Sequence, residues 1–400
     1  HPLARTGQRR AVVDHGSRTM DVTLRIVPGP VAKLGEITFE GAEGIDPRFL
    51  RRRLRIRPGS PYDPDALEEA REDLIDSNLF STVRPVEATA LDGDEGPNTN
   101  LFWESRNWLG GGERLRLELE LSPIRQAALA SFRNPEFLAR GQNLLVDGST
   151  KHEDTDAFTT TSVGAGVGLE RYFTRKLIAT LGLAYRYADI EEPDEATTVG
   201  LASIPATLDW DFTDNRLDAT RGGLLLVQVA PFVDTLEPTR QFLKARATHS
   251  RYVTLLAERR LVLAARGSLG SIVGVARNEV PADERFYAGG GGSVRGIGFQ
   301  LAGPLDGDDK PLGGKSILEL NGELRLRVTE TIGAVAFLDA GTVFEESYPD
   351  LSEPLRFGAG IGLRYLTPVG PLRLDGGVPL SRRADVDDPF QIYISIGQAF

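Results

Sequence analysis

The sequence predicts an all-β transmembrane barrel of about sixteen antiparallel strands, preceded by a small α/β domain. Between Leu101 and Phe400 we count fifteen segments, typically 9 to 14 residues long, in which apolar and polar side chains alternate. Strands of soluble proteins average about 5–6 residues, whereas a tilted strand needs about 9–11 to cross a bilayer. The mean hydropathy of −0.20 is near neutral, as expected where every second side chain faces lipid and the others face a polar lumen.

Composition narrows the classes of function. The formal charge is −11 and the sequence has no basic stripe. We therefore expect no nucleic-acid partner, because phosphate binding depends on clustered Lys and Arg. The absence of cysteine rules out disulfides and thiolate-bound metals. The four histidines share no metal-ligand spacing, and none lies beside a candidate Ser nucleophile. We predict no metal, no cofactor and no enzyme activity.

Residues 1–29 precede the first complete domain. No basic segment followed by an apolar run is present, so we find no signal peptide and expect the sequence to be a fragment that lacks upstream residues. Met20–Val27 alternates like a strand, and Pro28-Gly29-Pro30 ends it. We interpret residues 1–29 as the C-terminal part of a preceding domain.

Residues 30–88 carry the helix signals. Asp46-Pro47 and Asp63-Pro64 each place a capping carboxylate before a proline at the first helical position, where the missing N–H costs nothing. Strand-like segments at 35–41 and 80–84 flank the two helices. This pattern predicts a β-α-α-β domain, an interaction or linker module with no chemistry of its own.

We assign residues 89–400 to the barrel. In Glu113–Leu121, for example, Leu fills every second position and charged residues fill the others. A soluble sheet with one wet face also alternates, so a soluble β-rich binding protein stays open as an alternative. Bacterial single-chain barrels have even strand numbers, so a sixteenth strand is expected between Arg84 and Leu101. That stretch is a poor strand, which predicts a first strand that is irregular or partly missing.

The last predicted strand is Phe390–Phe400. Ile392 and Ile394 share one face with Phe400, and Tyr393 and Gly397 share the other. A C-terminal Phe on an alternating strand resembles the recognition signal of outer-membrane proteins. An ordinary terminal strand of a soluble sheet is the simpler alternative.

Glycine-rich residues 287–299 are the most unusual segment. An engineered flexible linker does not explain Val294-Arg295-Gly296 or the aromatic flanks. A phosphate-binding loop would need a strand-loop-helix context and a following Lys-Ser or Lys-Thr, which the segment lacks.

Val294-Arg295-Gly296 resembles the sixth extracellular loop motif of the outer-membrane assembly-factor superfamily, which includes BamA, TamA and the two-partner secretion transporters. Ile297 stands where the family has Phe or Tyr. Phe337-Leu-Asp339-Ala-Gly341 resembles the strand motif that meets this loop inside the barrel. Residues 30–88 resemble a polypeptide-transport-associated (POTRA) domain, and residues 1–29 the tail of another.

The resemblance implies a function and partners. It predicts a protein of the bacterial outer membrane, in contact with outer-membrane lipid, with its POTRA domain in the periplasm. Its function would be to assemble or insert client outer-membrane proteins, such as autotransporters. Gly298–Pro304 and Ser395–Phe400 are most similar to the TamA family, which implies a TamB-like periplasmic partner that docks through the POTRA region. A two-partner secretion transporter, a BamA-type barrel and a passive porin remain alternatives.

Two groups of residues are the candidate functional sites. By alternation Phe337, Asp339 and Gly341 face the lumen, where Asp339 can hold the planar guanidinium of Arg295, with Glu323 as a second partner. The loop is then either a structural plug or a gate. The other group is the seam between the first and last strands. Gly397 of the last strand is expected to weaken the seam, and Phe400 is the terminal residue of that strand.

Overall fold

The computed structural model describes two compact units, residues 1–81 with 106–113 and residues 82–105 with 114–400. The described residues are 5–14, 19–27, 33–34, 37, 45–54, 56–61, 63, 65–67, 69–70, 87–92, 96–216, 218–256, 260–367, 370–396 and 398–400. Among them, no helix has the length and apolar character needed to span a bilayer.

The first unit contains the hairpin β1 (Arg5–Asp14) and β2 (Thr19–Val27) and the helix α1 (Pro47–Arg53). The predicted cap of α1 is confirmed, because Asp46 Oδ1 accepts from the backbone N–H of Arg48 at 2.8 Å. Residues 65–67 and 69–70 are helical after Asp63, as expected. Of the predicted strands 35–41 and 80–84, only Ile37 lies within the described residues. The proposed domain boundaries at residues 29 and 88 stay predictions.

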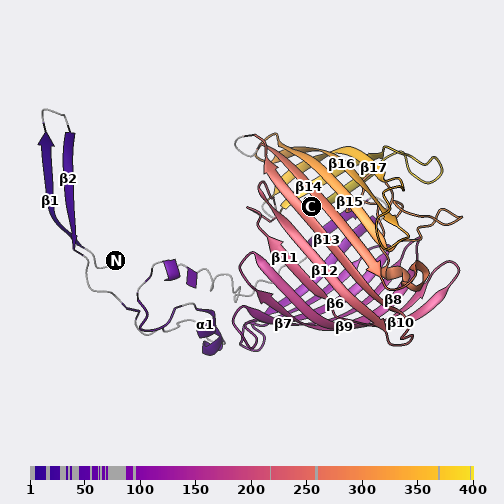
Figure 1. Ribbon diagram of the computed structural model, residues 1–400, viewed down its shortest axis with the longest axis horizontal. Helices are drawn as coiled ribbons and strands as arrows, with labels where there is room; N and C mark the ends of the chain where they lie inside the picture. Colours follow the sequence, from indigo (N-terminus) through magenta and orange to yellow (C-terminus); the bar gives the residue numbers. More distant parts are fainter. Residues whose placement is uncertain are drawn as a thin grey trace. The chain divides into compact units, whose positions relative to one another are not determined.

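The second unit is a closed antiparallel barrel (Figure 1). Its strands are β3 (Glu87–Asp92), β4 (Gly96–Arg106), β5 (Arg114–Leu121), β6 (Arg125–Asn134), β7 (Gln142–Asp154), β8 (Thr159–Tyr172), β9 (Leu177–Glu191), β10 (Ala196–Ser203), β11 (Ala206–Asp211), β12 (Gly222–Asp234), β13 (Gln241–Thr254), β14 (Leu261–Val273), β15 (Ser316–Arg327), β16 (Ile332–Phe344), β17 (Arg356–Thr367), β18 (Gly370–Pro379) and β19 (Gln391–Ile396).

The predicted barrel of sixteen strands is confirmed. β10 and β11 both pair with β9 and β12, so they are two halves of one strand, interrupted at Ile204-Pro205. With β10 and β11 counted as one, the described part of the barrel wall has sixteen strands. The strand expected between Arg84 and Leu101 is the six-residue β3, which forms a hairpin with the start of β4. The short length and the irregular register of β3 fit the poor strand sequence.

Alternation along each strand separates a lipid face from a lumen face. On β15, Leu320 and Leu324 are exposed on the outside, whereas Glu319, Asn321 and Glu323 are buried inside. A soluble protein would cover the outer row of leucines, because contiguous exposed apolar patches of this extent are rare in water. Contact with lipid, as the transmembrane prediction requires, therefore explains the apolar outer surface.

The two ends of the barrel differ in their connections. One end, here called the loop end, carries the long connections, including residues 274–315 between β14 and β15. The other, the turn end, carries short turns such as 328–331 and receives the chain as it enters β3. In Figure 1 the near strands β12, β13 and β14 run side by side at a common slant.

The outer face can be tested with one charge. Leu320→Arg places a guanidinium on the lipid side of β15, and we expect it to destabilise the barrel by about 2–4 kcal/mol if the position lies near the bilayer midplane. Ser149→Arg on the lumen side of β7 is the control and should cost much less. Urea unfolding in liposomes measures both, and equal costs would contradict the assignment of the two faces.

Candidate functional site

The connection 274–315 folds back into the barrel. Val294 and Ile297 are fully buried and join an apolar cluster with Ile272, Ile317 and Val343 of the barrel wall. Loops of this length are uncommon in compact domains unless they have a function. Ile297 fills the position where the family has an aromatic residue, and its side chain is fully enclosed.

Arg295 is the anchor of this loop. Its Nε and Nη2 donate to the two carboxylate oxygens of Asp339 at 2.7 and 3.0 Å. Its Nη1 donates to Glu323 at 2.6 Å and to Asp375 at 3.2 Å. Only 1% of the Arg295 surface is exposed. A bidentate guanidinium–carboxylate pair combines charge with fixed geometry, so the loop is held in one register on β15 and β16.

The aromatic ring of Phe337 completes the Arg295 pocket. The Arg295 guanidinium carbon lies 3.7 Å from the ring centroid, within the range of an attractive cation–π contact. Burial lowers the pKa of Arg295, but the hydrogen bonds and charges of Asp339 and Glu323 outweigh burial and raise it. The guanidinium therefore stays charged at any working pH, and the anchor cannot be released by deprotonation.

Further arginines surround the carboxylates. Arg325 Nε donates to Glu323 at 2.7 Å, Arg364 hydrogen-bonds to Asp375, and Arg373 lies 3.3 Å from Asp375. Arg295, these three arginines and the three carboxylates form what we call the lumen charge cluster: Arg295, Glu323, Arg325, Asp339, Arg364, Arg373 and Asp375. Charges taken out of water are tolerated only when they are paired and hydrogen-bonded in this way.

Glycines on the loop and on the barrel wall let the loop backbone lie close to the wall. Gly296 has φ +92°, and a Cβ there would lie 2.8 Å from the backbone of Val378. A Cβ at Gly358 would lie 1.8 Å from the Arg295 carbonyl oxygen, so no larger residue fits. At this approach the Gly296 N–H donates to the Tyr393 hydroxyl of β19 at 2.9 Å. The loop motif thus contacts the last strand directly.

Gly341 lies on the lumen side of β16, against the loop. A Cβ on Gly341 would meet Val294 at 3.0 Å and the Leu318 carbonyl at 2.8 Å, so the glycine makes room for the loop. The structure brings together all seven residues predicted for the loop and its partners: Val294, Arg295, Gly296, Glu323, Phe337, Asp339 and Gly341. Asp375 and the flanking arginines were not predicted, because alternation alone does not say which lumen residues of β17 and β18 meet the loop.

A second set of contacts holds the loop at its other side. Nη1 and Nη2 of Arg285 donate to the two carboxylate oxygens of Glu192 at 2.6 and 2.9 Å. The Glu284 carboxylate forms ion pairs with Lys244 at 3.0 Å and with Arg186 at 2.9 Å. Arg285 and Glu284 belong to the loop, and their partners lie on β9, directly after β9 and on β13. Sequence reasoning missed them, since no motif marks either partner.

The ladder described at the seam between β19 and β3 is short. Among the described residues, β19 pairs with β3 only at Ile394 and Leu91. By contrast, the ladder between β12 and β13 runs without a break from Gly222–Tyr252 to Val233–Gln241. If such a short ladder opens, the backbone groups that it exposes are costly in lipid and can template another strand. Gly397 lies outside the described residues.

The predicted extent of the last strand is wrong. β19 ends at Ile396, and Phe400 does not share the outer face of Ile392 and Ile394. It lies inside the lumen, packed against Tyr252 and Val262. The ladder explains the end of the strand: after the pair Leu372–Ile396, the next β18 residue is Pro371. Proline has no N–H to donate, so the pairing cannot continue regularly.

The carboxylates do not form a metal site. Within the described part of the chain, no three His, Asp or Glu side chains group closely enough to hold a metal ion. Each carboxylate of the lumen charge cluster instead faces at least one guanidinium. The arrangement suits holding a loop in place rather than covalent chemistry.

Comparison with known proteins decides the family. A sequence profile of the Omp85 superfamily domain matches residues 107–400, and a POTRA profile, described as a surface antigen variable number repeat, matches residues 32–101. The chain belongs to the Omp85 superfamily. Its barrel lies in the bacterial outer membrane and its POTRA domain in the periplasm, so the turn end faces the periplasm.

Two curated relatives are outer membrane protein assembly factors BamA. The chain is 24% identical to that of Neisseria meningitidis serogroup B over 96% of its own length and 58% of the relative's. It is 25% identical to that of Nitratidesulfovibrio vulgaris over 98% of its own length and 51% of the relative's. The chain thus spans little more than half the length of these relatives.

Solved structures share the fold. BamA of Haemophilus ducreyi lacking POTRA domains 1–3 superposes with a TM-score of 0.79 at 18% identity, covering 99% of this chain and 90% of that one. CdiB of Acinetobacter baumannii gives 0.61 at 13% identity, covering 97% and 77%. CdiB of Escherichia coli gives 0.62 at 17% identity, covering 98% and 80%.

Removing the anchor should loosen the loop. Arg295→Met leaves the Asp339 carboxylate buried without its ion-pair partner, a change that typically costs about 3–5 kcal/mol, while Glu323 keeps Arg325. We expect faster protease cleavage within 274–315 and a lower melting temperature. Arg295→Lys should rescue little, because an ammonium cannot form the fork.

Arg216→Gln is the matched control for the loss of an arginine. Its ion pair with Asp209 spans 2.8 Å, but 60% of its side chain is exposed. Such pairs contribute at most about 1 kcal/mol. If the two variants lost equal stability, Arg295 would not be an anchor.

Proposed function

We propose that this protein assembles or inserts client proteins into the bacterial outer membrane through the seam between β19 and β3. The observation that carries the proposal is the short ladder at this junction, where the described residues pair at Ile394 and Leu91. A short ladder opens at a lower cost than a long one, and a client strand could pair with the backbone N–H and C=O groups that opening exposes to lipid. The names of the BamA relatives support the same class of activity.

The loop motif gives the seam a support that is independent of β3. Gly296 donates to Tyr393 at 2.9 Å, while Arg295 is fixed to β15, β16 and β18. The last strand can therefore stay docked to the lumen contents when its pairing with β3 is lost. We infer that the loop is part of the gate and more than a passive plug.

The finer assignment rests on sequence alone. Gly298–Pro304 and Ser395–Phe400 are most similar to the TamA family, which favours a translocation and assembly module role with autotransporters among the clients. A TamB-like protein would then be the periplasmic partner, docked through the POTRA region. A two-partner secretion transporter is the alternative within the superfamily. A passive porin is the alternative outside it, and the purified barrel would then show a large, stable conductance.

Locking the seam tests the central step. The chain has no native cysteine, so Leu91→Cys with Ile394→Cys creates one defined disulfide at the paired position. We expect the oxidised protein to lose insertion of a client barrel into liposomes and the reduced protein to recover it.

The control lock joins Val227→Cys to Ala247→Cys, paired positions of β12 and β13 far along the wall from the seam. This disulfide should leave insertion intact. Full activity with the seam locked would refute the mechanism.

The gating role of the loop has its own test. Arg295→Ala should leave a folded barrel in the membrane but reduce client insertion in cells, because the support of β19 is loosened. Barrel content is checked by the mobility of the unheated protein on SDS gels. Unchanged client insertion would reduce the loop to a structural plug.

A further inference from the structure

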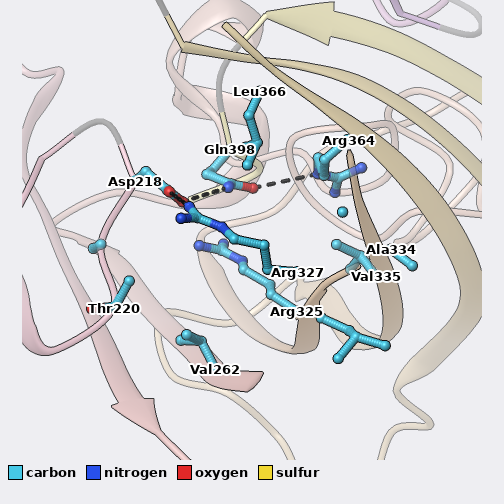
Figure 2. A pocket seen from close by; sticks show the side chains of 13 residues that line it. Asp218, Thr220, Val262, Arg325, Arg327, Ala334, Val335, Arg364, Leu366 and Gln398 are labelled. Carbon is cyan, nitrogen blue, oxygen red and sulfur yellow. Dashed lines mark hydrogen bonds and ion pairs between the residues drawn. The ribbon is translucent and has the colours of Figure 1, made fainter. Parts of the chain in front are cut away.

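The segment after β19 occupies a built site on the inner wall at the turn end. Figure 2 shows Gln398 between Asp218 and Arg364. Gln398 Nε2 donates to Asp218 at 3.1 Å, and Arg364 Nε donates to Gln398 at 3.4 Å. The segment thus bridges β17 to the connection that precedes β12.

Phe400 lies in a pocket with two kinds of wall. One is apolar and comprises Ala219, Tyr252, Val262 and Ala264, all of them buried. The other is cationic: the guanidinium carbons of Arg325 and Arg266 lie 5.2 and 5.7 Å from the centroid of the ring. Cations within about 6 Å of an aromatic centroid are attracted to its face. The pocket therefore selects an aromatic side chain over an aliphatic one.

The backbone of the segment is recognised too. Arg325 Nη2 donates to the Phe400 carbonyl oxygen at 3.0 Å. Among the described residues, Nη1 of Arg325 and Nε of Arg266 have no hydrogen-bond acceptor, although Arg325 is only 8% exposed. These donors can serve further acceptors of a peptide that lies along the wall.

The segment does not fill the available space. A cavity of about 40 Å³ remains beside Gln398, lined by Thr220, Val262 and Arg325. Figure 2 shows these side chains around it, with Arg327 close to Asp218. Because the described ladder between β18 and β19 ends at Leu372 and Ile396, the contacts described for residues 398–400 are with side chains of the lumen wall. A peptide that fills the site better can displace residues 398–400 without breaking a β-ladder.

We propose that this inner wall of β13–β15 is a receptor site for an aromatic residue of an extended peptide segment. Residues 398–400 fill it in the resting protein, and a segment of an incoming client displaces them. The identity of the occupant rests on the proposed function, because the client is the extended chain that reaches the lumen from the periplasm. Displacement frees the end of β19 at the same time as the client is captured.

The test measures peptide binding without client insertion. The receptor is the purified chain truncated after Ile396, in detergent, and the probe is a fluorescent peptide of residues 391–400. We expect the peptide to bind the truncated chain, and to bind at least about tenfold more weakly when its last Phe is Ala. The intact chain should also bind the Phe peptide at least about tenfold more weakly, because its own segment occupies the site.

A substitution locates the binding. Ala264→Leu fills the floor of the pocket and should abolish the preference for the Phe peptide, whereas Ala128→Leu on the outer face of β6 is the matched control. If the truncated chain does not fold, Phe400→Ala in the full chain replaces it as the receptor. Equal binding of the Phe and Ala peptides, or a preference that survives Ala264→Leu, would overturn the site.

The two proposals fail separately. Selective peptide binding by a protein that never inserts a client would retain the site and remove the proposed function. Normal client insertion by a protein with no aromatic preference would retain the function and remove the site.

Discussion

The structure depends on one buried guanidinium. Arg295 joins a loop that starts and ends at β14 and β15 to carboxylates on β15, β16 and β18. Arg295 is the ion-pair partner of Asp339, and without it that buried carboxylate would lose the guanidinium that compensates its charge. Glu323 and Asp375 are also held by Arg325, Arg364 and Arg373, so Arg295 links the loop to a charge network that the wall already contains.

This constraint extends to the seam. The close approach that Gly296 and Gly358 permit sets the loop backbone against β17 and β18, and the Gly296 N–H meets Tyr393 on β19. The last strand is therefore held from inside the barrel as well as by β18. These lumen contacts help to hold β19 in place beside β3.

Sequence alone predicted the barrel because alternation over long segments is the direct consequence of a wall with lipid on one side. The resemblance of the loop and strand motifs to those of the family placed Asp339 near Arg295, and alternation predicted that Asp339 faces the lumen, with Glu323 as a second partner on the neighbouring strand. Sequence alone missed Asp375, Arg364 and the contact between Glu192 and Arg285. Proximity across the lumen depends on how the strands are arranged around the barrel, and this leaves no local pattern in the sequence.

The last strand shows where pattern reasoning was incomplete. Phe390–Phe400 alternates throughout, so the continuation of the strand to Phe400 was the natural prediction. The signal against it was in the neighbouring strand β18, where Pro371 lies at the position whose N–H would donate to β19. Leu366 of β17 pairs with Pro371 and points its own N–H away from β18, to the carbonyl of Thr331 in the turn before β16. A strand is limited by its partner as much as by its own sequence.

The central claim is that the Arg295 anchor holds the last strand. Amide hydrogen exchange of the barrel in lipid, compared between the wild type and Arg295→Met, tests it most directly. We expect faster exchange in residues 391–396 together with the loop, and unchanged exchange in β7 and β8. Faster exchange in the loop alone, with β19 as protected as before, would contradict it.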